Sequence, residues 1–84
     1  MQTVRVYTKG RCWYCRAALK LLHDKGIVLE EVDVTRDAQA RVWLQETTGQ
    51  RTVPQVFIGG QSIGGYSELA ALERMGELDP LLRG

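Results

Sequence analysis

The spacing of apolar residues changes at Cys12, and this change constrains the fold more than any other feature of the chain. Before it, Val4-Arg5-Val6-Tyr7 alternates apolar and polar residues, which predicts a strand over about residues 3–8. After it, apolar residues recur at helical spacing, at Ala17, Ala18, Leu19, Leu21 and Leu22. Lys25-Gly26 then supplies a cationic last turn and a terminal glycine, typical of a helix end. The sequence therefore predicts a strand–helix unit with a cysteine at its junction.

The middle of the chain repeats this change of spacing. Residues Ile27 to Val34 alternate once more and predict a second strand. Either Thr35 or Asp37 can cap the helix that follows, because their side-chain oxygens accept hydrogen bonds from the free amides of a helix start. We expect this helix to end near Gly49, with its apolar positions at Ala38, Val42 and Leu44.

The last third of the chain predicts a hairpin followed by a helix. Val53 to Ile58 is an apolar run entered through a proline and predicts a third strand. Gly59-Gly60 is a turn dipeptide that suits a hairpin into Ser62-Ile63. We expect the last helix to begin at Ser67 and to stop at Gly76, followed by a tail to Gly84 that contains Pro80.

The predicted order is strand, helix, strand, helix, strand, strand, helix. A strand–helix–strand segment in one sheet forms a right-handed parallel crossover, whereas a tight turn joins antiparallel strands. We therefore expect an α/β fold in which three helices flank a mixed four-stranded sheet. The 84 residues fall below the roughly 100–200 that each further domain would need, so residues 1–84 are expected to form a single domain.

Composition argues against several classes of partner. The 11 basic and 10 acidic residues leave a net charge of +1, which gives no reason to expect binding to nucleic acid or to an anionic membrane. No apolar run approaches the ~18 residues of a membrane helix. The first ten residues lack the apolar run of a secretion signal, so we expect a cytoplasmic protein. In that reducing compartment a close cysteine pair is more often catalytic or metal-binding than a structural staple.

Cys12 is placed where its sulfur can become a nucleophile. At the N-cap of the first helix it can accept hydrogen bonds from the free amides of Tyr14 and Cys15. The helix dipole and nearby cations such as Lys9 add positive potential. An ordinary cysteine, with a pKa near 8.5, is only about 3% thiolate at pH 7. We therefore expect the cap to lower the pKa of Cys12 and to make it the attacking thiolate.

Cys15 lies one helical turn after Cys12, so the two sulfurs share a face within reach of a disulfide. Cys15 is expected to be more buried and to resolve the mixed disulfide formed at Cys12. Two other interpretations stay open. A zinc site would need four ligands, and the chain offers only one histidine, His23, beside this pair. A purely structural disulfide would close so short a loop that it would stabilise little.

Two loops are candidates to face the cysteines. At Thr52-Val53-Pro54, we expect a cis Val53–Pro54 bond that exposes the Val53 backbone to an extended peptide; a trans edge proline with no role is the alternative. In Gly64-Gly65-Tyr66-Ser67-Glu68, the glycine pair leaves the Tyr66 and Ser67 amides open, which suits a carboxylate. The alternative for this second loop is a plain turn with a serine cap.

Taken together, these elements resemble a dithiol glutaredoxin, a member of the thioredoxin-fold superfamily. The resemblance rests on Tyr7-Thr8-Lys9 before Cys12-Trp13-Tyr14-Cys15, on Gly49 to Ile58, and on Ile63 to Leu69. It implies a thioredoxin-like fold, a cis Pro54 and glutathione as co-substrate. It further implies catalysis by Cys12 and Cys15 and a glutathione groove formed by Lys9, Tyr14, Arg51, Thr52, Val53, Pro54, Gly65, Tyr66 and Ser67.

The resemblance also implies an activity and partners. We expect a glutathione-dependent thiol–disulfide oxidoreductase that reduces protein–glutathione mixed disulfides and protein disulfides, with ribonucleotide reductase as one candidate client. The protein is expected to be a monomer. Two alternatives remain: a dimer that shares a [2Fe-2S] cluster through Cys12 and bound glutathione, or a redoxin reduced by thioredoxin reductase.

Three positions depart from the family pattern. Trp13 stands where the family usually has proline, which keeps the cluster alternative open because some relatives without that proline resemble cluster-binding proteins. Ser67 replaces a common aspartate, which weakens the expected contact with the amino group of the ligand. Glu46 replaces a glutamine or arginine that would lie near its glycine carboxylate.

Overall fold

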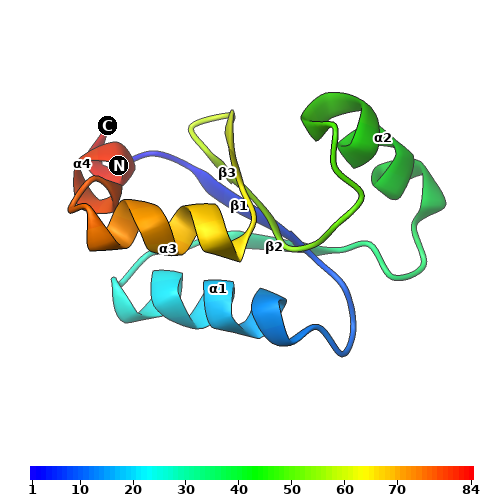
Figure 1. Ribbon diagram of the computed structural model, residues 1–84, viewed down its shortest axis with the longest axis horizontal. Helices are drawn as coiled ribbons and strands as arrows, with labels where there is room; N and C mark the ends of the chain where they lie inside the picture. The colour runs from blue at the N-terminus through cyan, green and yellow to red at the C-terminus, as the bar shows by residue number, and fades with distance from the viewer.

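The computed structural model describes residues 1–84 and consists of one four-stranded sheet with helices on both faces (Figure 1). Its elements in chain order are β1 (Val4–Thr8), α1 (Trp13–Asp24), β2 (Glu30–Asp33), α2 (Ala38–Thr48), β3 (Gln55–Ile58), β4 (Gln61–Gly64), α3 (Tyr66–Arg74) and α4 (Leu78–Arg83). The strands are ordered β2-β1-β3-β4 across the sheet. No helix combines the length and the hydropathy needed to cross a membrane.

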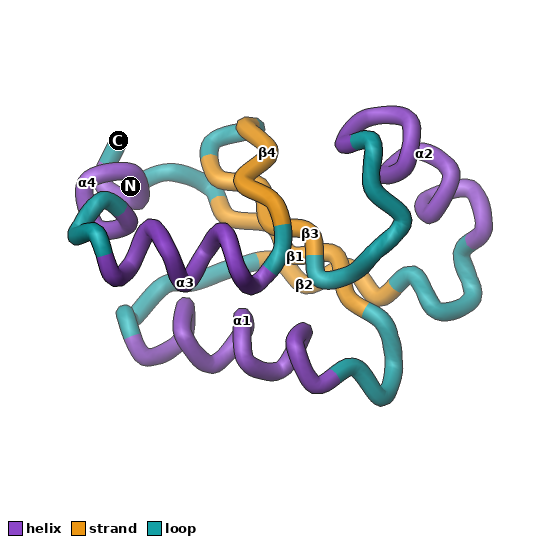
Figure 2. The backbone as a smooth tube through the Cα atoms, viewed as in Figure 1, coloured by secondary structure: helices purple, strands orange, loops and turns teal.

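The sheet is mixed, as the sequence predicts. β1 and β2 run parallel, with Val6 opposite Glu31, and α1 connects them. β1 and β3 run antiparallel, with Val6 opposite Val56, and β3 turns directly into antiparallel β4. The α/β fold class predicted from residue spacing is confirmed. β1 is one of the two central strands of the sheet, and the loop at its end leads into the start of α1, toward the lower right of Figure 2.

Alternation along β1 explains how the helices divide between the faces. Val4 and Val6 point to the face covered by α1 and α3, where they join a cluster of ten buried residues that includes Ala18, Leu22 and Leu69. The face on the other side of the sheet carries Tyr7 and is only partly covered, by α2, which lies apart from the other helices (Figure 1). A second, smaller cluster there consists of Tyr7, Val34, Leu44 and Phe57.

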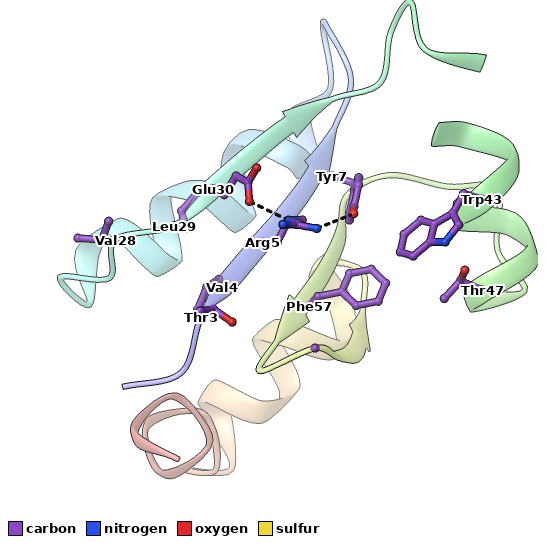
Figure 3. Close-up of a pocket in the computed structure, with 11 residues that line it drawn as sticks. Thr3, Val4, Arg5, Tyr7, Val28, Leu29, Glu30, Trp43, Thr47 and Phe57 are labelled. Atoms are coloured by element: carbon purple, nitrogen blue, oxygen red, sulfur yellow. Dashed lines mark hydrogen bonds and ion pairs between the residues drawn. The ribbon is translucent and has the colours of Figure 1, made fainter. Parts of the chain in front are cut away.

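The α2 face is built on aromatic packing. Tyr7 and Phe57 lie edge to face with ring centroids 5.6 Å apart, and Trp43 of α2 covers both rings. Arg5 reaches between Glu30 and the Tyr7 hydroxyl, as the dashed lines in Figure 3 show. The hydrogen bonds to Tyr7 and Glu30 raise the pKa of Arg5. Trp43 therefore packs α2 against the sheet, although the residue stays 45% exposed.

Two predictions about element boundaries are wrong. The tail is a fourth helix, α4, which buries Leu78 and Leu82 against the main core. Pro80 lies in its first turn, where a proline is tolerated because the first amides of a helix have no intrahelical partner. The second strand begins at Glu30 and not at Ile27, because the Ile27 amide bonds the Leu22 carbonyl and closes the turn after α1.

Candidate active site

Cys12 is the N-cap of α1, as the sequence predicts. Its backbone is extended, and its Sγ accepts a hydrogen bond from the Cys15 amide at 3.1 Å. The Tyr14 amide, which we also expected to donate, makes no such bond. The turn that delivers the cysteine contains Arg11 at φ 58°, the only residue other than glycine with a positive φ.

Cys12 and Cys15 form a disulfide, with their Cα atoms 5.2 Å apart. Cys15 is 2% exposed, whereas Cys12 is half-buried at the start of the helix, so the predicted difference in burial is confirmed. An exchange partner can reach only the sulfur of Cys12. The accessible position and the helix cap therefore belong to the same residue, which suits the nucleophile of a thiol–disulfide exchange.

The Thr52-Val53-Pro54 loop faces Cys12, and the expected cis bond precedes Pro54. The Val53 carbonyl oxygen lies 3.8 Å from Cys12 Sγ. Behind the loop, fully buried Gln55 donates from Nε2 to the Thr52 carbonyl and to Gln50 Oε1, both at 2.9 Å. Sequence reasoning missed this role of Gln55; the signal was a polar residue inside an otherwise apolar run.

The glycine turn before α3 is capped by Glu68 and not by serine. Gly65 is the N-cap residue, and its amide donates to Glu68 Oε1 at 2.7 Å. α3 begins at Tyr66, so the expected helix start at Ser67 is one residue late. Within α3 the first backbone bond runs from the Leu69 amide to the Gly65 carbonyl, which leaves the amides of Tyr66 and Ser67 free to bind an acceptor.

These loops enclose a groove of about 580 Å³ beside the cysteines. Eight of the nine predicted glutathione contacts line it, together with Gln50 and Glu68: Tyr14, Arg51, Thr52, Val53, Pro54, Gly65, Tyr66 and Ser67. At one wall the rings of Tyr14 and Tyr66 lie 6.0 Å apart. The groove is therefore lined by two tyrosines, the Thr52-Val53-Pro54 loop and the start of a helix.

Lys9, the ninth predicted contact, lines a smaller cavity of about 200 Å³ that shares Arg51, Thr52 and Val53 with the groove. Arg41 of α2 lines it as well, so this cavity, which we call the cation cavity, brings three cations to one end of the groove. Sequence reasoning did not identify Arg41, since nothing in the local pattern relates α2 to this loop. Glu46 lines neither cavity.

A larger cavity, about 660 Å³, lies between the sheet and α2 near Arg5, Trp43 and Phe57 (Figure 3). It contains neither cysteine. We place the active site at the smaller groove because it is lined by Tyr14, which lies between the two cysteines in the sequence, and by Val53, whose carbonyl faces Cys12. His23 is exposed near the end of α1, away from the cysteines, and no group of three or more metal-binding side chains exists.

A cysteine pair that opens the first helix of this four-stranded sheet, with a groove beside it, defines a thiol–disulfide oxidoreductase of the thioredoxin fold. Comparison with known proteins narrows the class. Residues 4–63 match the family model described as Glutaredoxin. The chain belongs to the glutaredoxin family.

Individual relatives agree over nearly the whole chain. Glutaredoxin 3 of Escherichia coli K12 is 43% identical over 83 residues, which cover 99% of this chain and all of that protein. The solved buckwheat glutaredoxin–glutathione complex superposes with a TM-score of 0.91 at 34% identity, over 98% of this chain and 77% of that one. A solution structure of glutaredoxin from Brucella melitensis gives a TM-score of 0.88 at 43% identity, over 98% and 89%.

Proposed function

We propose that this single-domain enzyme uses glutathione to reduce protein–glutathione mixed disulfides and protein disulfides. The observation that carries the proposal is the groove between the Thr52-Val53-Pro54 loop and the start of α3, which opens beside Cys12. A similar protein, buckwheat glutaredoxin, has been solved as a complex with glutathione. An extended tripeptide thiol fits a site of this shape, because free backbone groups and charged ends lie along its length.

The exchange proceeds in two displacements. The Cys12 thiolate attacks the glutathione sulfur of a mixed disulfide, so a bond forms between Cys12 and glutathione and the client leaves as a thiolate. A second glutathione thiolate then attacks the bound glutathione, which releases oxidised glutathione and regenerates the Cys12 thiolate. With a protein disulfide, Cys15 instead displaces the client from Cys12 and forms the Cys12–Cys15 disulfide, which two glutathione molecules reduce.

Each end of the tripeptide has a matching charge in the groove. The glycine carboxylate pairs with Lys9, Arg51 and Arg41, the three cations at one end. The γ-glutamyl carboxylate accepts hydrogen bonds from the free amides of Tyr66 and Ser67 at the start of α3. Glu68 is the only acidic residue in the groove, so we assign the ligand's ammonium group to it in place of the aspartate that Ser67 lacks.

The cysteine that joins Cys12 pairs with the backbone of Val53 as an added strand, beside Thr52 and Pro54, while Tyr14 flanks the sulfur. We further propose that the protein acts as a monomer in the cytoplasm. Its clients are glutathionylated or disulfide-containing proteins, among which ribonucleotide reductase is a candidate.

Substitution of each cysteine tests the proposal. Cys12→Ser should abolish turnover with both kinds of substrate, because it removes the attacking sulfur. Cys15→Ser should retain removal of glutathione from a glutathionylated peptide and lose reduction of a protein disulfide. Coupled assays with glutathione and glutathione reductase, and separately with thioredoxin reductase, measure both reactions. Equal loss in the two variants on the glutathionylated peptide, or turnover with thioredoxin reductase alone, would refute the proposed roles.

Trp13 keeps a second candidate function open. It occupies the first position of α1, where the family usually has proline, and its ring is 76% exposed beside Cys12. The chain has no cluster of metal-binding side chains, so a [2Fe-2S] cluster would need Cys12 and bound glutathione from each of two protomers. Anaerobic purification with iron, sulfide and glutathione tests this: a visible charge-transfer band together with a dimer supports it, and a colourless monomer excludes it.

A further inference from the structure

The turn that leads into the active site holds an unfavourable backbone conformation. Arg11, directly before Cys12, adopts φ 58°, a left-handed conformation in which the side chain of an L-residue crowds the backbone. Such a residue persists only where its neighbours fix the chain on either side of it. After Arg11 the chain is fixed by Cys12, at the start of α1. Before Arg11 it is fixed by Gly10.

Gly10 is held by a segment distant in the sequence, which we call the Asp33–Thr35 clamp. The Gly10 amide donates to Thr35 Oγ1 at 2.8 Å. The Thr35 hydroxyl and amide both donate to Asp33 Oδ1, at 2.6 and 2.8 Å. Because the Thr35 hydroxyl donates its hydrogen bond to the Asp33 carboxylate, the oxygen of Thr35 accepts the hydrogen bond from the Gly10 amide. The direction of every bond in the clamp is therefore fixed.

The clamp is itself anchored in the fold. Asp33 ends β2 opposite Thr8 of β1, and the Val34 amide extends that pairing to the Thr8 carbonyl at 2.9 Å. From α2, Arg41 Nη1 donates to the carbonyls of Val34 and Thr35 at 2.7 and 2.9 Å. The hydrogen bonds from Thr35 hold the pKa of Asp33 below its ordinary value, so this acceptor stays ionised at neutral pH.

We propose that Thr35, oriented by Asp33, is a positioning residue for Cys12. By fixing Gly10 it keeps Arg11 left-handed and holds the Cys12 sulfur against the Cys15 amide that stabilises its thiolate. Thr35 makes no hydrogen bond to either cysteine and lines neither the groove nor the cation cavity. The inference rests on the proposed function in one respect, that Cys12 is the nucleophile.

Thr35→Val tests the proposal, because valine keeps the branched shape and removes the hydroxyl. We expect the iodoacetamide reaction of Cys12 in the reduced protein to slow about threefold to fivefold at a pH below the midpoint of its pH profile, where the rate follows the thiolate fraction; this is the factor that one ordinary net hydrogen bond supports. The midpoint of its pH profile should rise. Thr35→Ser should restore the wild-type rate, since serine keeps the hydroxyl. Thr47→Val is the matched control, because Thr47 lies exposed on α2 and makes no side-chain hydrogen bond.

A second variant separates positioning from general stability. Arg11→Gly removes the cost of the left-handed conformation, so Cys12 no longer depends on the clamp. Thr35→Val should therefore slow alkylation less in an Arg11→Gly background than in the wild type. Asp33→Asn, which keeps the shape and removes the charge, should shift the rate in the same direction as Thr35→Val and gives an independent test if the valine variant unfolds.

Alkylation of the wild type and of the variants distinguishes failure of the clamp proposal from failure of the proposed function. A wild-type Cys12 that reacts no faster than an ordinary thiol would overturn the role of Cys12 itself. If Cys12 of the wild type reacts fast, and Thr35→Val or Asp33→Asn alters thermal stability but leaves the alkylation rate and its pH profile unchanged, only the role of the clamp would be overturned. Equal slowing by Thr35→Val with and without Arg11→Gly would also overturn it.

Discussion

Gly64→Ala, which adds a single methyl group, should both destabilise the protein and distort the groove. The φ of Gly64 is 114°, a conformation that L-residues rarely adopt. A Cβ there would lie 2.7 Å from Glu68 Oε1 and 2.9 Å from Glu68 Cγ, closer than such atoms approach. Glu68 can move only by releasing the Gly65 amide, to which it is bonded at 2.7 Å. Gly64→Ala therefore combines backbone strain with the loss of a helix cap.

The expected loss in the free energy of unfolding is the sum of these two contributions. Backbone strain of this kind costs about 1–3 kcal/mol, and the lost cap hydrogen bond costs about 1 kcal/mol. We expect Gly64→Ala to lower the free energy of unfolding by about 2–4 kcal/mol, measured by urea denaturation. It should also weaken glutathione binding, since the displaced carboxylate and the start of α3 both line the groove.

Gly60→Ala is the matched control for this prediction. Gly60 also has a positive φ, of 80°, but no atom lies within 4 Å of the position that a Cβ would take. It should show the strain alone and leave glutathione binding unchanged, because Gly60 does not line the groove. If Gly64→Ala were no more destabilising than Gly60→Ala, or left the KM for glutathione unchanged, the assigned role of Glu68 would be wrong.

Two further changes are predicted from local geometry. Lys25 donates to Asp79 and Glu73, and these bonds raise its pKa above 10.5. Their stabilisation is therefore complete below pH 10.5 and is lost as the pH rises through the raised pKa. Between pH 9 and 12, the free energy of unfolding from urea denaturation should fall more steeply for the wild type than for Lys25→Met, and parallel curves would contradict this. Trp13→Pro should raise the free energy of unfolding by about 0.4–1 kcal/mol, because proline suits the first helical position and the Trp13 amide makes no bond there. A lower free energy of unfolding in urea denaturation would contradict this, since it would mean that the Trp13 amide has a partner.

Local patterns predicted most of the fold and the centre of the site. The change of spacing at Cys12 placed β1, α1 and the cap, since both strand and helix periods are properties of neighbouring residues. The same argument failed for α4: the sequence predicted three helices and a tail after Gly76 that contains Pro80, whereas Pro80 lies in the first turn of a fourth helix. Its burial of Leu78 and Leu82 depends on the core already formed by other elements.

The residues that sequence reasoning missed all act over distance or from behind the site. Thr35 bonds Gly10 across 25 residues, and Arg41 reaches the cation cavity from α2. Gln55 and Glu68 lie next to predicted residues, but their side chains bond the backbone of the loops, Gln55 at the Thr52 carbonyl and Glu68 at the Gly65 amide. No spacing rule within one element relates such pairs, because the sheet brings them together only after folding.

The account depends most directly on the ionisation of one sulfur. In the reduced protein, the rate at which iodoacetamide alkylates Cys12 should already be near its maximum at neutral pH and should fall only under acidic conditions, because the thiolate is capped by the start of α1. A rate that instead climbs between about pH 7.5 and 9.5, as for an ordinary cysteine, would contradict it.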